Sequence, residues 1–140
     1  MLFSIIIPAY NAASSLPDTL SSIYQQTYDG YEIILINDGS ADATESVCKV
    51  FCESHNNTHY VRQNNMGVYE ARRKGAEISA GDYLVFVDAD DSLRFDTLSI
   101  LAREIDKCNP DIICFSYTRN PDYSNDPFIN PALPSGIYEG

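Results

Sequence analysis

Near its start the chain reads Phe3-Ser4-Ile5-Ile6-Ile7-Pro8-Ala9-Tyr10-Asn11, an almost unbroken apolar run that gives way to a polar turn. A strand that is apolar at nearly every position is typical of a parallel sheet with both faces covered by helices. We therefore predict a strand over residues 3–7 that is buried on both faces of such a sheet.

The rest of the chain alternates between short apolar runs and helical patterns. Further strands are predicted at residues 31–36, 58–62, 83–87 and 112–117, and helices at residues 16–24, 41–53, 67–78 and 95–108. Ser14 or Ser15 is expected to cap the first helix, and Ser40 the second. This βαβα order predicts an α/β fold with a mainly parallel sheet and helices on both faces.

The composition limits the partners. The chain has 140 residues, with 20 acidic against 9 basic side chains and a formal net charge of -11. This excess of negative charge argues against nucleic acid or an anionic membrane bound through bulk charge, since both need a basic surface. No lysine or arginine precedes Lys49, so the first third must hold any anionic ligand without basic side chains.

Polar segments follow three of the predicted strands. They are Pro8-Ala9-Tyr10-Asn11, Asn37-Asp38-Gly39-Ser40 and Asp88-Ala89-Asp90-Asp91. Ligands of open α/β sheets bind beyond the carboxyl ends of the strands. An aromatic ring, a single carboxylate and a carboxylate cluster are therefore predicted to meet at one edge of the sheet.

The acidic cluster comes directly after the apolar residues 85–87. Carboxylates this close repel one another unless a cation lies between them, and Mg²⁺ or Mn²⁺ prefers such oxygen ligands. Asp88 and Asp90 are therefore predicted metal ligands, the alternative being a solvated loop. Asp91 has a second interpretation as the cap of the following helix.

Tyr10 and Asp38 each have two interpretations. Tyr10 is either a core residue or a ring that stacks on a nucleobase. Asp38 is either a turn residue or an acceptor for a ligand N–H, such as that of a pyrimidine. Taken with the acidic cluster, the two residues predict a nucleotide site in which a metal bridges the diphosphate.

The three segments, together with Asn65-Met66-Gly67 leading to Ala71-Arg72, resemble the family-2 glycosyltransferases in order and spacing over roughly residues 3–117. The resemblance implies a GT-A nucleotide-diphospho-sugar transferase fold, apparently truncated. A nucleotide-sugar-binding GT-A domain is expected over residues 1–118. A proline-rich loop over residues 119–140 is expected to lead into a missing acceptor-binding part.

The resemblance also assigns roles. Tyr10 would stack on the base, Asp38 would hydrogen-bond its ring nitrogen, and Arg72 would lie near the nucleotide. Asp88 would reach the ribose or the metal, and Asp90 would coordinate Mn²⁺ or Mg²⁺, which assists departure of the nucleotide diphosphate. The implied substrate-binding residues are Pro8, Ala9, Tyr10, Asn11, Asp38, Arg72, Asp88 and Asp90.

The implied reaction is an inverting transfer of a sugar, most simply from a UDP-sugar, to an acceptor hydroxyl. The acceptor would be a glycan or a lipid-linked molecule, in synthesis of cell-surface polysaccharide or lipopolysaccharide. The expected location is the cytoplasm, with peripheral association of the full-length enzyme at the inner face of the membrane left open, as is a homodimer. No residue is assigned as the general base, which in the family lies beyond the acidic cluster in the acceptor-binding half.

Two alternatives stay open on the sequence. One is a non-catalytic module that binds a sugar nucleotide and transfers nothing. The other is a haloacid-dehalogenase-like phosphatase, whose nucleophile loop is similar to residues 85–93, although Asp91 replaces its glycine. Dinucleotide dehydrogenases and P-loop proteins are excluded, because neither of their glycine-rich motifs occurs.

Overall fold

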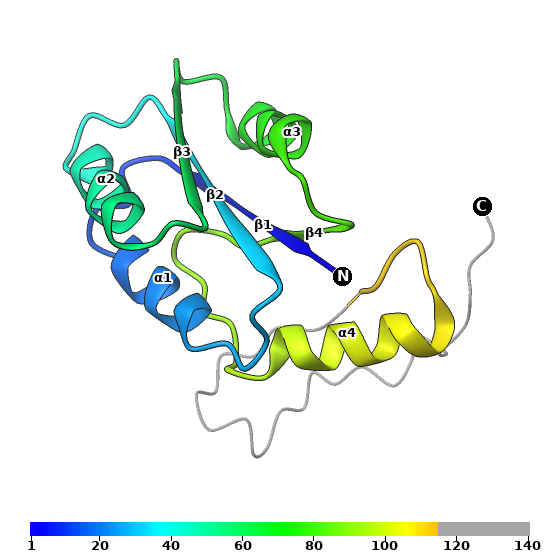
Figure 1. Ribbon diagram of the computed structural model, residues 1–140. Helices are drawn as coiled ribbons and strands as arrows, with labels where there is room; N and C mark the ends of the chain where they lie inside the picture. The colour runs from blue at the N-terminus through cyan, green and yellow to red at the C-terminus, as the bar shows by residue number, and fades with distance from the viewer. Residues whose placement is uncertain (115–140) are drawn as a thin grey trace, which may run out of the picture. The chain divides into compact units, whose positions relative to one another are not determined.

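The structure, a computed structural model, describes residues 1–114. The chain falls into two compact units, one of residues 1–102 and one that starts at Arg103. Figure 1 shows the order of the elements. They are β1 (Phe3–Ala9), α1 (Leu16–Tyr24), β2 (Tyr31–Asp38), α2 (Thr44–Ser54), β3 (Thr58–Gln63), α3 (Val68–Ile78), β4 (Tyr83–Phe86) and α4 (Thr97–Cys108).

The four strands form one parallel sheet in the order β3-β2-β1-β4. Ile5 of β1 pairs with Ile33 of β2 on one side and with Val85 of β4 on the other. All seven residues of β1 are buried, as the apolar run predicted. The predicted α/β class and parallel sheet are therefore confirmed.

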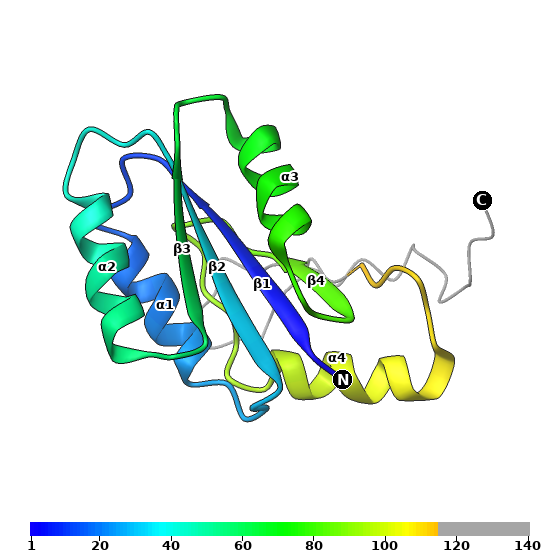
Figure 2. The same ribbon diagram turned by 45° about the horizontal axis from the view of Figure 1, so that its top comes forward.

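Helices cover both faces of the sheet, with α1 and α2 on one side and α3 on the other (Figure 2). On the α3 side, Ile6, Ile34 and Ile36 pack with Ala71 in a buried apolar cluster. These strand residues are two apart, or directly paired across the sheet, so they share one face. Helix α1 buries the predicted positions Leu16, Leu20 and Ile23.

Helix α3 approaches the sheet closely because Gly75 has no side chain. A Cβ atom built on Gly75 would lie 2.4 Å from Cγ2 of Ile6, which is closer than two carbon atoms can approach. The residue is buried within the helix and directly covers β1. Gly75 therefore sets the distance between α3 and the sheet.

Some predicted boundaries were wrong. Strand β2 continues through Asn37 and Asp38, which were predicted to form a turn, because both pair with neighbouring strands. Ser40 does not cap α2, which begins at Thr44, where the Asp42 carboxylate accepts a hydrogen bond from the Thr44 N–H. Ser15 occupies the N-cap position of α1 without a side-chain cap bond.

The predictions near the end of the described chain also need correction. Helix α4 begins at Thr97, so Asp91 lies too far upstream to cap it. Residues 112–114, the described part of the fifth predicted strand, are not in a strand. The rest of that strand and the proline-rich residues 119–140 lie outside the described residues. Within residues 1–114, no helix has both the length and the apolar character needed to cross a bilayer.

The contact between Gly75 and Ile6 gives a test of the fold. Replacing Gly75 with Ala is expected to lower the free energy of unfolding by about 1–3 kcal/mol, because the added methyl overpacks the core. Denaturant unfolding measures the change, with Glu77→Ala on the exposed side of α3 as the control. A gain in stability, as for Gly→Ala in a solvent-exposed helix, would contradict the packing described.

Candidate functional site

A cleft of about 400 Å³ lies at the carboxyl ends of β1 and β4, beside the first turns of α3. Six of the eight predicted substrate-binding residues line it, whereas Ala9 and Asp38 do not. These two side chains are 1% and 4% exposed. The lining residues are Pro8, Tyr10, Asn11, Ala12, Ser15, Val68, Arg72, Asp88, Ala89 and Asp90.

Tyr10 belongs to the surface of the cleft and not to the core. Its side chain is 53% exposed directly after β1. The next residue, Asn11, has a positive φ of 49°, a conformation that asparagine adopts more readily than most residues. The backbone therefore turns sharply after Tyr10 and leaves the ring accessible to a ligand.

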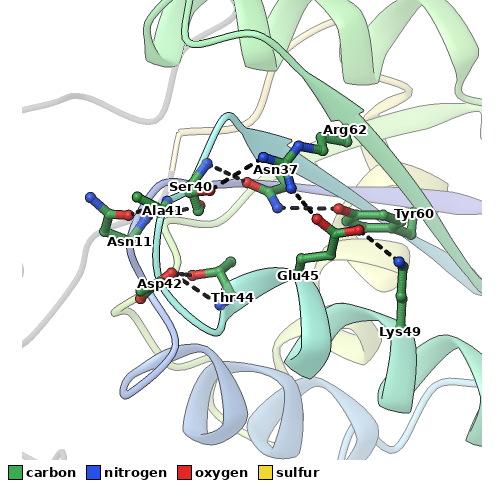
Figure 3. A network of polar contacts seen from close by, with 10 residues as sticks. All are labelled: Asn11, Asn37, Ser40, Ala41, Asp42, Thr44, Glu45, Lys49, Tyr60 and Arg62. Carbon is green, nitrogen blue, oxygen red and sulfur yellow. Dashed lines mark hydrogen bonds and ion pairs between the residues drawn. The ribbon is translucent and has the colours of Figure 1, made fainter.

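Hydrogen bonds tie the loop after β1 to the loop after β2 (Figure 3). The Asn11 N–H donates to Oγ of Ser40 at 3.0 Å, and the Ala41 N–H donates to Oδ1 of Asn11 at 2.9 Å. The Ala12 N–H donates to Oγ1 of Thr44 at 2.8 Å. Ser40, predicted as a helix cap, thus fixes the backbone that carries Tyr10.

Asn37, at the end of β2, supports this loop network through its side chain, a role that the sequence analysis missed. Its side chain is fully buried, accepts a hydrogen bond from the Ser40 N–H at 2.9 Å and donates to the Tyr60 hydroxyl at 3.1 Å (Figure 3). On the outer side, Glu45 pairs with Lys49 and with Arg62. An amide at the end of an otherwise apolar strand was the available signal for Asn37.

Asp38 points to the other side of the sheet and binds the loop before α3. Oδ1 accepts hydrogen bonds from Nε2 of Gln63 at 2.8 Å and from the Met66 N–H at 2.9 Å, and Oδ2 accepts from the Gly67 N–H at 2.8 Å. Burial opposes ionisation, but the three hydrogen bonds outweigh it and lower the pKa of Asp38. The predicted contact with a base stays a prediction.

Arg72 and Asp88 form an ion pair in the lining of the cleft. Nη2 of Arg72 lies 2.5 Å from Oδ1 of Asp88, and the two side chains are 37% and 49% exposed. The Arg72 Nε is buried and has no hydrogen-bond partner among residues 1–114. The structure thus places a guanidinium beside the predicted metal ligands.

The carboxylates of the acidic cluster lie close enough for the charges of two of them to disfavour ionisation of the third. The pKa of Asp91 is raised, first by burial and then by the charges of Asp90 and Asp88. Asp91 itself does not line the cleft, in contrast to its two neighbours. Two carboxylates therefore line the cleft, and their negative charge raises the pKa of a third beside it.

Asp88 and Asp90 suit Mg²⁺ or Mn²⁺ by donor chemistry. Both supply carboxylate oxygens, and such ions are often bound by only one or two carboxylates with substrate phosphates completing the shell. No cluster of three or more metal-ligating side chains occurs in the described part of the chain. The residues present therefore fit a metal that is held jointly with a phosphate ligand.

The comparisons with known proteins point to one family. The family model described as "Glycosyl transferase family 2" matches residues 4–132. The glycosyltransferase GlyA of Streptococcus pneumoniae is 38% identical over 114 residues, which is 81% of this chain and 16% of GlyA. The chain therefore spans only a small part of this relative.

Two solved structures share the fold. TarS 1–349 of S. aureus in complex with UDP-GlcNAc has a TM-score of 0.75 and 27% identity, covering 79% of this chain and 33% of TarS 1–349. The mannosyltransferase PcManGT of Pyrobaculum calidifontis in complex with GDP-Man and Mn²⁺ has a TM-score of 0.69 and 26% identity, covering 74% and 32%. The predicted GT-A fold is confirmed.

The buried Asn37 amide provides a test of the loop network. Asn37→Ala is expected to lower the free energy of unfolding by about 1–3 kcal/mol, because the Ser40 N–H and the Tyr60 hydroxyl lose their partner. Denaturant unfolding measures this, and Asn56→Ala on the exposed surface is the control. Equal effects of the two substitutions would show that Asn37 does not support the network.

The hydrogen bonds of Asp38 predict a pH dependence. Its folded pKa lies below the unfolded value of about 3.9, so its ionised form stabilises the fold above that pH. This contribution is lost as the pH falls through the folded pKa. Thermal unfolding at pH 7 should show Asp38→Asn less stable than the wild type by roughly 2 kcal/mol. The gap should close toward pH 2, and a gap that stays constant with pH would contradict the assignment.

Proposed function

Because the chain belongs to glycosyl transferase family 2, we propose that it forms the donor-binding part of an enzyme that transfers a sugar from a nucleotide-diphospho-sugar to an acceptor hydroxyl. The observation that carries the proposal is the meeting of Tyr10, Arg72, Asp88 and Asp90 in one cleft. An aromatic ring, a guanidinium and two carboxylates are the groups that a nucleoside, its diphosphate and a divalent metal require.

The donor is proposed to be a UDP-sugar. The TarS structure in complex with UDP-GlcNAc, at 27% identity, supports this choice, whereas PcManGT at 26% identity is in complex with GDP-Man. Tyr10 would stack on the base, with Pro8 and Asn11 beside it. Among residues 1–114, Oδ2 of Asp38 accepts a hydrogen bond from the Gly67 N–H alone, and a base N–H would use its second acceptor position.

Asp88 and Asp90 would hold Mn²⁺ or Mg²⁺, and the Mn²⁺ in the PcManGT structure supports this assignment. Bound metal supplies electrostatic stabilisation to the departing nucleotide diphosphate. Arg72 places a second positive group at the same wall of the cleft, where it pairs with Asp88. In the cleft, Arg72 and the metal site supply the positive charge that the first third of the chain lacks.

The transfer is proposed to invert the configuration at the sugar carbon, as the family resemblance implies. Inversion requires a base that takes the proton of the acceptor hydroxyl, and none of the described residues is assigned to that role. The proposed acceptor is a glycan or lipid-linked molecule, in synthesis of cell-surface polysaccharide at the cytoplasmic side of the membrane. The phosphatase alternative is not supported, since the family match and the similar proteins are glycosyltransferases.

Calorimetric titration of the chain with UDP tests the site. UDP is expected to bind in the presence of Mn²⁺ and to bind at least tenfold more weakly without it, because two carboxylates would otherwise face the diphosphate. Asp90→Asn should remove the metal dependence.

The matched control for this titration is Asp29→Asn, which makes the same charge change before β2, at the opposite end of the strands. It is expected to bind UDP like the wild type. UDP binding that is indifferent to Mn²⁺ in the wild type, or no UDP binding at all, would overturn the proposed site.

A further inference from the structure

Asp38 holds a loop of its own chain although it also follows the predicted pattern of a base-binding residue. All three of its hydrogen-bond donors belong to residues 63–67, between β3 and α3. The side chain is 4% exposed and does not line the cleft. Most of the acceptor capacity of this carboxylate is therefore used inside the protein.

One of these donors, Gly67, is the residue from which α3 begins. Gly67 has a φ of 89° and occupies the N-cap position, so its N–H points back toward Asp38 while the chain turns into the helix. Val68 and Arg72 are four residues apart on α3, which places them on one face of the helix. Both line the cleft.

A second contact holds the same loop against the end of β2. Gly39 has a φ of 74°, and a Cβ atom at this position would lie 2.7 Å from the Asn65 backbone nitrogen. The backbone after Asp38 is therefore packed directly on the loop that the carboxylate binds. Asp38, the last residue of β2, and Gly39, which follows it, thus both contact the loop that leads into α3.

The contacts that start at Asp38 continue through Gly67 and α3 to the Arg72–Asp88 ion pair. Ala71 and Gly75 are buried and hold α3 to the sheet, so the start of the helix before Ala71 is the part that depends on Asp38. Arg72 lies next to Ala71 and reaches Asp88 at 2.5 Å. A displaced first turn would move the guanidinium away from the acidic cluster.

We propose that Asp38 is a positioning residue for the diphosphate half of the site: through Gly67 and the first turn of α3, it places Arg72 beside Asp88. This inference rests on the proposed function and adds to it. If Asp38 served only as a contact for the base, its loss would affect nucleotides according to their base. As a positioning residue, it also affects ligands that have no base.

The test compares UDP with inorganic pyrophosphate, each titrated calorimetrically in the presence of Mg²⁺. Asp38→Asn is nearly isosteric, but it turns an acceptor toward Gly67 into an amide donor. It is expected to weaken pyrophosphate binding by a factor of roughly ten, as for the loss of one charge-assisted hydrogen bond. It should weaken UDP binding by at least that factor, because UDP also loses the contact with its base. Tyr10→Ala should weaken the binding of UDP and leave the affinity for pyrophosphate unchanged.

A stability control separates positioning from general destabilisation. Tyr24→Phe removes the hydroxyl that bonds Thr58 at the opposite end of β3, far from the loop at residues 63–67. This variant is expected to have a lower Tm than the wild type but the same affinity for pyrophosphate. In Asp38→Asn, amide hydrogen exchange should accelerate at Gly67, which loses its acceptor.

The outcomes are distinct. Unchanged pyrophosphate affinity in Asp38→Asn, with UDP weakened, would overturn the positioning role and leave the proposed function intact. Unchanged exchange at Gly67 would overturn it as well. A wild-type chain that binds neither UDP nor pyrophosphate would instead overturn the proposed function on which the inference rests.

Discussion

Two consecutive polar side chains are buried where β2 ends, and the need to hydrogen-bond both of them organises this edge of the sheet. A buried polar group without a partner costs about 1–3 kcal/mol, so each side chain requires donors or acceptors from elsewhere in the chain. Successive residues of a strand point to opposite faces. Asn37 therefore fixes the loops that lie toward α2, and Asp38 fixes the loop that leads into α3.

The edge of the sheet separates its structural residues from those offered to a ligand. The side chains that join loops are buried, as Asn37 and Asp38 are, whereas Tyr10, Arg72 and Asp88 remain partly or largely exposed in the cleft. An exposed side chain can exchange water for a ligand without breaking the fold. The buried hydrogen bonds of Asn37 and Asp38 keep the backbone of the loops in place, so the residues that face the ligand are carried on a fixed backbone.

Local patterns were sufficient for the four strands of the sheet, their parallel order and most of the cleft, because apolar runs and strand ends are properties of neighbouring residues. They failed for Asn37 and Asp38, since Asn-Asp-Gly-Ser is typical of a turn. The partners that hold these two residues in a strand, such as Tyr60 and Gly67, lie more than 20 residues further along the chain. Ser40 was misjudged for the same reason: the backbone that it binds belongs to another loop.

The two walls of the cleft differ in the kind of bond that maintains them. The wall that carries Tyr10 is held by amides, hydroxyls and backbone groups, as in the contacts of Asn11 with Ser40 and Ala41, and carries no net charge in those bonds. On the other wall, the side chain of Arg72 is held beside Asp88 by a partly exposed ion pair. Dissolved salt screens the second kind of interaction much more than the first. Ionic strength therefore acts on this cleft one wall at a time, loosening its charged side while the aromatic side keeps its shape.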